Sequence, residues 1–308
     1  MVNGPERKSV IMAVGGGKGG VGKSFVMASL GMSLARQGKV VMIDGDLGGA
    51  NLHNFLGISR PTSSLTDFFE RKVPLADLVV DSGTRNLGLL TGMVGTIGAE
   101  AIKHAQKQKL FNQIKKLDAD YILIDLGAGT HFNTIDTLLI ADKMLIVITP
   151  EIVSIENMYN FLRNLYFRRL GGALTEHGYR ELVVNTWRDR EELGIGNFRE
   201  LVDCLKAISP EVKLIIEEEL RDFAVHLVLN KARTNQDIVT GNSVKSICVK
   251  FFGVNALYSG YVEHDDLVSR SANQRTPYLT AYPNSRCARG IERLTVNILS
   301  GQQVKVTR

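Results

Sequence analysis

Residues 10–24 read VIMAVGGGKGGVGKS, and this stretch decides the fold. The apolar residues 10–14 predict a buried strand, which runs directly into a glycine-rich loop and then into a helix. Backbone N–H groups of such a loop can wrap closely around phosphates because glycine has no side chain, and the helix N-terminus adds favourable charge. The stretch therefore matches a P-loop in its proper setting between strand and helix.

The P-loop assigns roles to its polar residues. Lys23 is expected to reach the β- and γ-phosphates, and the Ser24 hydroxyl to bind Mg²⁺. A second lysine, Lys18, lies five residues before Lys23 in an otherwise neutral loop, and it needs an anion, which is either a phosphate of its own nucleotide or one of a partner's. The nucleotide-binding residues expected in this loop are Gly17, Gly19, Gly20, Val21, Gly22, Lys23 and Ser24.

Carboxylates follow two further apolar runs, residues 40–43 and 121–124. Ligands of open α/β sheets bind at the C-terminal ends of the strands, so Asp44 is expected near Lys23 and the Mg²⁺ shell. Asp46 is expected over the γ-phosphate, where it would orient or deprotonate the attacking water, although it could also serve only as a turn-former. Asp125 looks like a Walker B aspartate that holds Mg²⁺ through water.

The run HLVLNKAR, residues 226–233, bears on the choice of base. Asn230 at a strand end offers amide donors and an acceptor to a purine edge, although it could equally be a simple strand-end cap. Arg233 has no acceptor for the N–H groups of guanine, so adenine is favoured.

The loop GKGGVGKS with its extra lysine resembles the MinD/ParA class of P-loop ATPases, and residues 46–53 are most similar to the FlhG-like MinD branch. The family pattern DxDxxxxN matches at Asp44, Asp46 and Asn51. The resemblance implies a nucleotide-sandwich homodimer bridged by ATP, in which Lys18 touches the partner's nucleotide. It also implies ATP and Mg²⁺ as cofactors. Lys18, Lys23 and Asp46 would act in catalysis, while Ser24, Asp44 and Asp125 would place the metal.

Alternation of apolar runs with helical stretches predicts an α/β fold with a mostly parallel, doubly covered sheet. Analogy with the family suggests one domain, residues 1–308, with seven or eight strands. The strands are expected at 10–14, 40–43, 121–124, 144–148, 226–229 and 256–258, and the helices at 24–36, 99–117, 154–169, 237–252 and 284–299. The apolar positions of the last helix predict a stripe that faces the core.

Residues 171–223 break this alternation and are expected to form an insertion at the edge of the domain. The segment is polar, and one helix is predicted within it, at 197–208, ending before Pro210. Glu217, Glu218 and Glu219 read as a solvated helix face, with a partner surface as the alternative.

Composition limits the remaining possibilities. A net charge of +5 leaves nucleic acid or anionic lipid open as partners, but no run of five like charges exists, so a scattered solvated surface is the simpler reading. The three cysteines form no C-x-x-C pair, and no apolar stretch reaches the length of a membrane span. A cytoplasmic chain is therefore expected, with recruitment to a membrane, a cell pole or the nucleoid as options.

Together these features predict a Mg²⁺-ATP-dependent, dimerising ATPase. It is expected to hydrolyse ATP slowly and to be stimulated by an unidentified protein activator. Its expected role is that of a switch in spatial positioning, for example of flagella or division sites. A DNA-partitioning ATPase that binds nonspecific DNA is one alternative. A metal-cofactor assembly ATPase is another, against which the missing cysteine pair counts. The third alternative is a nucleotide-gated scaffold without useful hydrolysis, and the presence of Asp46 argues against it.

Overall fold

One eight-stranded sheet organises the computed structural model, with the strand order β3-β4-β2-β5-β1-β6-β7-β8. Residues 9–17, 19–46, 51–92, 104–127, 132–253 and 255–304 are described. The strands are β1 (Val10–Gly15), β2 (Val40–Asp44), β3 (Val80–Asp81), β4 (Leu87–Leu90), β5 (Tyr121–Asp125), β6 (Lys143–Ile148), β7 (Ala224–Ala232) and β8 (Asn255–Glu263). All neighbouring strands are parallel except the pair β3 and β4, which is antiparallel. The prediction of a mostly parallel sheet is therefore confirmed.

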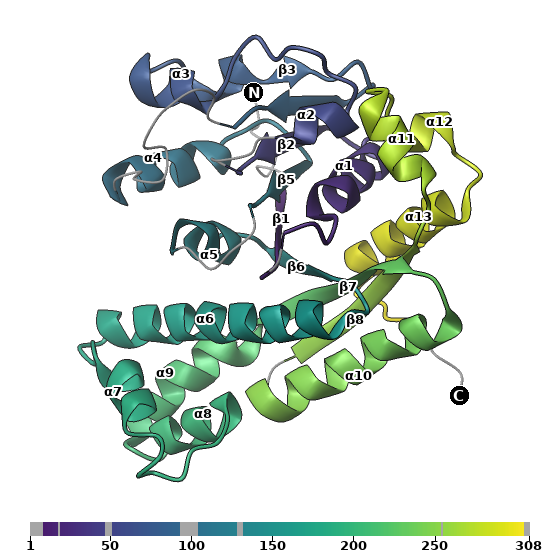
Figure 1. Cartoon of the computed structure of the whole chain (residues 1–308). Coiled ribbons are helices and arrows are strands. Elements are labelled where there is room, and N and C mark those ends of the chain that lie inside the picture. Colours follow the sequence, from purple (N-terminus) through teal and green to yellow (C-terminus); the bar gives the residue numbers. More distant parts are fainter. Residues whose placement is uncertain are drawn as a thin grey trace.

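Helices cover both faces of this sheet (Figure 1). The helices are α1 (Lys23–Leu34), α2 (Leu52–Phe55), α3 (Leu65–Glu70), the 3-10 turn η1 (Leu75–Leu78), α4 (His104–Ile114), α5 (Phe132–Leu139), α6 (Ile152–Glu176), α7 (Leu182–Arg188), α8 (Phe198–Lys206), α9 (Pro210–Arg221), α10 (Asn235–Phe252), α11 (Leu267–Asn273), α12 (Tyr278–Ala281) and α13 (Arg286–Ser300). One core joins the sheet to α3 to α10, and a second joins it to α1, α2, α12 and α13.

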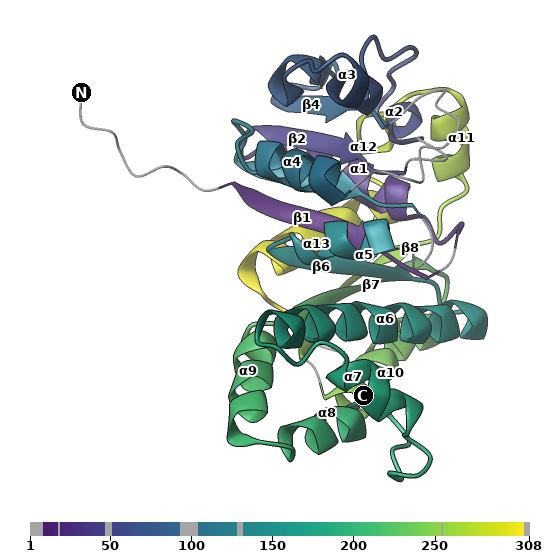
Figure 2. The ribbon, with the colours of Figure 1, turned by 90° about the vertical axis from the view of Figure 1, so that its left-hand side faces the viewer.

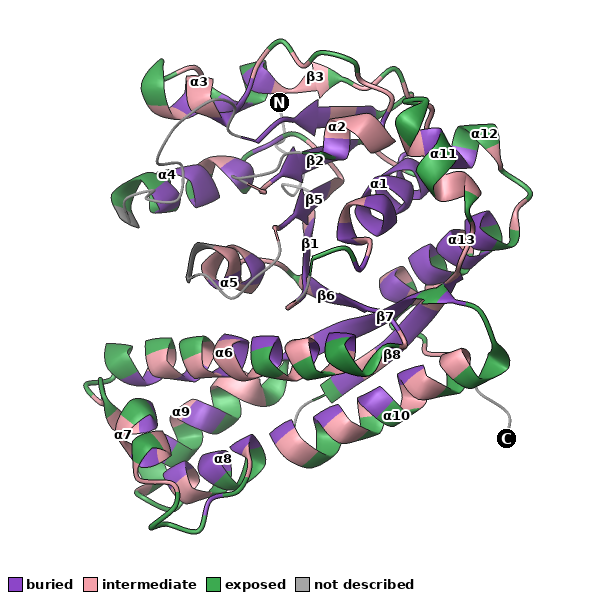
Figure 3. Ribbon diagram, in the orientation of Figure 1, coloured by how far each residue is buried: buried purple, intermediate pink, exposed green. Residues whose placement is uncertain are grey.

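Each central strand feeds both cores because its side chains alternate between the faces. In β1, Ile11 and Ala13 belong to one core, while Met12 and Val14 belong to the other. Figure 3 shows the central strands largely buried, whereas β3 at the sheet edge is not buried and the outer helix faces are exposed. This explains why near-continuous apolar runs, and not alternating ones, marked the strands in the sequence.

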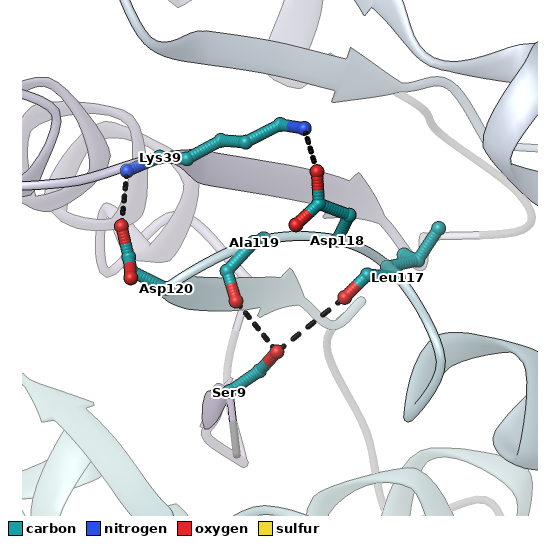
Figure 4. A network of polar contacts seen from close by, with 6 residues as sticks. All are labelled: Ser9, Lys39, Leu117, Asp118, Ala119 and Asp120. Atoms are coloured by element: carbon teal, nitrogen blue, oxygen red, sulfur yellow. Dashed lines mark hydrogen bonds and ion pairs between the residues drawn. The ribbon is translucent and has the colours of Figure 1, made fainter. Parts of the chain in front are cut away.

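The C-terminal ends of these parallel strands point to one side of the molecule, as Figure 2 shows for β1, β2 and β6. Their opposite, N-terminal edge is closed by the polar network of Figure 4. There the Ser9 hydroxyl donates to the carbonyl of Ala119 over 2.6 Å, and Lys39 binds Asp118 through its Nζ and Asp120 through its backbone N–H. The network ties the starts of β1 and β2 to the turn before β5 and leaves the other edge of the sheet for ligands.

Sequence reasoning missed two of the eight strands, β3 and β4. The strand β3 has two residues and β4 has four, so neither gives a hydrophobic period long enough to recognise. The other predicted strands are all present, and the five predicted helices correspond to α1, α4, α6, α10 and α13. Residues 93–103, which include the expected start of the helix at 99–117, lie outside the described residues.

The helix predicted at 197–208 is present as α8, but it is not the single helix of residues 171–223, because the segment also holds the end of α6 and the helices α7 and α9 (Figure 1). Pro210 was read only as a terminator of the helix before it. It is the first residue of α9, whose N-cap is Ser209, and the Ser209 hydroxyl accepts from the backbone N–H of Val212. The helix α6 continues past residue 169 because the buried Leu170 and Leu174 extend its apolar stripe.

The last helix, α13, turns its apolar stripe to the core as predicted: Ile291, Leu294 and Ile298 are fully buried. Ser285 caps it by accepting a hydrogen bond from the backbone N–H of Ala288. Among the described residues, no helix combines the length and the apolar character that crossing a membrane requires.

Candidate nucleotide-binding site

Three sequence motifs meet at the C-terminal edge of the sheet. The strand β1 delivers the P-loop, while β2 and β5, which pair with register partners Asp44 and Asp125, each end in a carboxylate. Val14 of β1 is also a register partner of Asp125, so the start of the P-loop lies beside Asp125, and Asp44 lies one strand further along the sheet. A cavity of about 800 Å³ opens there, a volume ordinary for a small-molecule site. Its lining includes Gly19, Gly20, Gly22, Lys23, Ser24, Asp46, Asn51, Asn230 and Lys231.

Glycine is required at several positions of the P-loop. Gly20 and Gly22 have φ values of 77° and 92°, in the left-handed region that favours glycine. A Cβ at Gly22 would also lie 2.2 Å from Nδ2 of Asn230, and one at Gly17 would lie 2.1 Å from the backbone oxygen of Asn157 in α6. The loop is thus held tightly by α6 on one side and by the end of β7 on the other. Lys18 lies outside the described residues.

The end of β7 braces the P-loop through two side chains. Asn230 donates from Nδ2 to the carbonyl of Val21 over 2.8 Å, and Lys231 donates from Nζ to the carbonyl of Gly20 over 2.8 Å. Asn230 and Val21 are both buried. Sequence reasoning placed Asn230 at the site but missed Lys231, although its position directly after a strand-end asparagine was an available signal.

Lys23 is the first residue of α1, and it is 8% exposed. Burial lowers the pKa of its ammonium group, while the nearby charges of Asp125 and Asp46 oppose that shift. A buried cation between carboxylates at a helix N-terminus attracts an anion that enters the cavity. This is the placement expected of a phosphate-binding lysine.

The two strand-end carboxylates are almost completely buried. Asp44 accepts hydrogen bonds from the backbone N–H groups of Leu52 and Asp46 at 3.0 and 3.2 Å, yet burial raises its pKa to about 6. Burial likewise raises the pKa of Asp125 to about 7, although a hydrogen bond with the Ser24 side chain acts to lower that pKa. The charge of Lys23 lowers the pKa of Asp125 only in part, so neither buried carboxylate is fully compensated by the protein.

The donor set fits Mg²⁺. Oδ1 of Asp125 is buried and has no hydrogen-bond partner among the described residues, and the Ser24 hydroxyl lies within hydrogen-bonding contact of the same carboxyl group. Carboxylate and hydroxyl oxygens are the hard ligands that Mg²⁺ prefers. Asp125 and Ser24 would hold the ion, while Asp44 lies on the neighbouring strand, with both of its oxygens engaged by backbone N–H groups.

Asp46 is half-buried and lines the same cavity. Its carboxylate lies over Gly127, where a Cβ would be 2.9 Å from Oδ1 of Asp46. Glycine at position 127 therefore gives the Asp46 carboxylate room beside the end of β5. The side chain is close enough to Lys23 to influence its pKa, which places it at the phosphate end of the cavity.

The far end of the cavity corrects the sequence argument about the base. Arg233 does not line the nucleotide cavity within the described residues; it lines a neighbouring one, where its Nη2 lies 2.8 Å from Nε2 of His264. Its lack of an acceptor therefore says nothing about guanine. Glu263 and Asp265 line the nucleotide cavity. The family resemblance places residues 260–265 beside the base, but sequence reasoning assigned no contact to either carboxylate.

Comparisons with known proteins agree with this geometry. The ParA family model, described as a NUBPL iron-transfer P-loop NTPase, matches residues 7–168. A MinD-type septum site-determining protein of Chlorella vulgaris is 30% identical over 252 residues, which are 78% of this chain and 85% of that protein. The antiactivator FleN of Pseudomonas aeruginosa is 31% identical over 158 residues, 50% of this chain and 56% of FleN. The solved structure of MinD from Pyrococcus horikoshii, complexed with Mg-ADP, has a TM-score of 0.62 and 21% identity, covering 97% of this chain and 100% of that one.

Proposed function

Because this chain belongs to the ParA/MinD family of P-loop ATPases, we propose that it is a Mg²⁺-ATP-dependent switch that dimerises with ATP and positions a cellular structure. The observation that carries the proposal is the arrangement of the P-loop, Asp44, Asp46 and Asp125 at one edge of the sheet. Slow hydrolysis and its stimulation by a protein activator are part of the proposal.

Each residue of the arrangement would have a distinct task. Lys23 would neutralise charge on the β- and γ-phosphates, and the backbone N–H groups of the loop at Gly20 and Gly22 would surround the phosphates. Ser24 and Asp125 would hold Mg²⁺, which supplies charge neutralisation at the phosphates when it is bound. Asp46, half-buried at the cavity wall, would orient the attacking water and accept its proton.

The surface beside the P-loop supports the self-association that we propose. The helix α6 starts at Ile152, directly after β6, and its Asn157 contacts Gly17 of the P-loop. Ile152 is 74% exposed and Val153 is 52% exposed, so an exposed apolar pair begins the helix that contacts the P-loop. A second copy facing this edge would cover the pair. Lys18 would then reach the partner's nucleotide, an assignment that rests on the family resemblance.

A role in spatial positioning is favoured by the extent of the likeness to MinD-type proteins, which covers more than three quarters of both chains. We propose two such roles, the placement of flagella and the placement of division sites. The description of the matching family model as an iron-transfer NTPase favours metal-cofactor assembly as a second candidate. The three cysteines lie on different helices, and Cys248 and Cys287 are buried, so the described structure offers no paired thiolates for a metal cargo. Binding of nonspecific DNA is the remaining alternative, and it predicts retention of duplex DNA by the ATP-loaded protein with a steep inverse salt dependence.

The test of the switch uses Asp46→Ala. The variant is expected to bind Mg²⁺-ATP with nearly unchanged affinity, to lose at least tenfold in hydrolysis rate, and to accumulate as a dimer measured by light scattering. Combining Asp46→Ala with Ile152→Glu should return it to a monomer that still binds ATP, because a carboxylate would then face the apolar pair of the second copy. A monomeric Asp46→Ala variant under saturating Mg²⁺-ATP would contradict the dimeric switch.

A further inference from the structure

We propose that the carboxylate of Glu263 determines base specificity by accepting a hydrogen bond from the exocyclic amino group of adenine. Glu263 is the last residue of β8 and lines the cavity that the P-loop opens. The inference deepens the proposed function and rests on the binding of ATP at that cavity.

The strand order places Glu263 at the far side of the cavity from the two metal-site carboxylates. The sheet runs β2-β5-β1-β6-β7-β8, so β8 lies beyond the P-loop strand and beyond β7. Glu263 is the register partner of Ala232, just past the residues that brace the P-loop. A nucleotide with its phosphates on the P-loop would extend its base towards this end.

The walls of the cavity around this end suit a purine. Phe25 and Phe55 both line the cavity, with ring centroids 6.2 Å apart, and Val268 and Ala272 of α11 add apolar surface. Figure 1 shows α11 beside α2 and α1, which carry the two phenylalanines. Aromatic and aliphatic side chains of this kind bury the faces of a base, so polar groups at the rim are left to read its edge.

Among the acceptors at this end, Glu263 has the carboxylate that is free to read that edge. Asp265 accepts from the Tyr278 hydroxyl and from the backbone N–H of Leu267. His264 contacts Arg233 and Asp266 through Nε2. Within the described residues, Glu263 is half-buried and lines both this cavity and the neighbouring one that contains Arg233, and its carboxylate takes part in no hydrogen bond or ion pair.

The chemistry of adenine matches such an acceptor. The exocyclic amino group is the hydrogen-bond donor on the pairing edge of adenine, and an ionised carboxylate only accepts. A bond from a neutral N–H to a carboxylate is charge-assisted and therefore stronger than one between neutral groups. A nucleotide without the amino group would leave Glu263 unpaired in a cavity closed by the ligand.

The experiment compares the Mg²⁺ complexes of ADP and of purine riboside diphosphate, which differ only in that amino group, by calorimetry. The wild-type protein is expected to bind ADP about tenfold more tightly than the analogue. Glu263→Ala should bind the analogue as the wild type does and ADP about tenfold more weakly, so that the preference disappears. Glu263→Gln, which retains an oxygen acceptor, should keep most of the preference.

The outcomes are distinguishable from failure of the proposed function. Absence of ADP binding and of ATP hydrolysis in the wild-type protein would overturn the proposed function, and this inference with it. Normal ADP binding with an equal preference in wild type and Glu263→Ala would overturn the role of Glu263 alone. Tighter binding of GDP than of ADP by the wild type would overturn the adenine assignment, because a carboxylate can accept from two N–H groups of guanine.

Discussion

Replacing Asn230 by aspartate tests whether the end of β7 holds the P-loop in its phosphate-binding shape. The substitution keeps the volume of the side chain but exchanges the Nδ2 donor for an oxygen, 2.8 Å from the carbonyl of Val21. Asn230 and Val21 are 4% and 3% exposed, so water cannot easily restore the lost bond. An unpaired buried carbonyl costs about 1–3 kcal/mol, which corresponds to a factor of roughly 5 to 150 in an equilibrium constant.

The aspartate variant should fall at the upper end of this range, since its ionised oxygen would also repel the carbonyl of Val21. Asn230→Ala, which only removes the donor, should fall at the lower end. Lys231→Ala is the matched control: its bond to the carbonyl of Gly20 starts from an exposed side chain, and removing it should weaken binding less than about fivefold.

The assay is calorimetric titration at pH 8 with two ligands, Mg²⁺-ADP and Mg²⁺-tripolyphosphate, of which the second has no base. If Asn230 acts by bracing the P-loop, both ligands should lose affinity by the same factor. An unchanged affinity for tripolyphosphate together with weaker ADP binding would refute the bracing role and would make Asn230 a base-reading residue instead.

Two further predictions concern the loop and the sheet. Gly22→Ala should lower the affinity for Mg²⁺-ADP by more than tenfold, because its Cβ would lie 2.2 Å from Nδ2 of Asn230 at a φ of 92°. In the control Gly20→Ala, the Cβ meets no atom within 4 Å, so this variant should show only the backbone strain of about 1–2 kcal/mol. Equal losses of affinity in the two variants would contradict the steric argument. Burial lowers the pKa of His226 to about 4, so the unfolded chain binds a proton below about pH 6.5 that the folded chain does not, and stability is lost as the pH falls from 6.5 towards 4. The wild type should lose about 2 kcal/mol between pH 7 and pH 5 in urea titrations from this group, and His226→Asn should be less sensitive by that amount, while identical pH profiles would count against the assignment.

Local sequence was sufficient for the parts of the site that one strand and its following loop build. The strand β1, the P-loop and α1 are contiguous, and Asp44 and Asp125 each directly end an apolar run that only a buried strand explains. Because parallel strands present their C-terminal ends at one edge, the meeting of these motifs could be predicted without knowing the strand order.

The rest of the site depends on contacts between distant parts of the chain. The bond from Asn230 to Val21 spans 209 positions, and the bond from Lys231 to Gly20 spans 211. No local pattern shows that β8 follows β7 in the sheet, and so the residues alone assigned no contact to Glu263. The same limit explains why Arg233 was wrongly used to argue for adenine. The backbone N–H of Arg233 binds the Asp237 side chain at the start of α10, and its guanidinium group lies against His264, outside the nucleotide cavity.

The electrostatics of the site argue that nucleotide binding and folding stability are coupled. Asp44 and Asp125 are buried carboxylates with raised pKa values, and Lys23 is a buried ammonium group with a lowered one, so each charge is incompletely compensated by the protein. A ligand that brings a divalent cation to Asp125 and phosphate oxygens to Lys23 supplies both missing partners at once. Since such a ligand binds the folded chain and not the unfolded one, it should stabilise the fold by about 2.7 kcal/mol at a hundred times its Kd. The groups that make the free site costly are therefore the same groups that make it selective for a magnesium–nucleotide complex over either component alone.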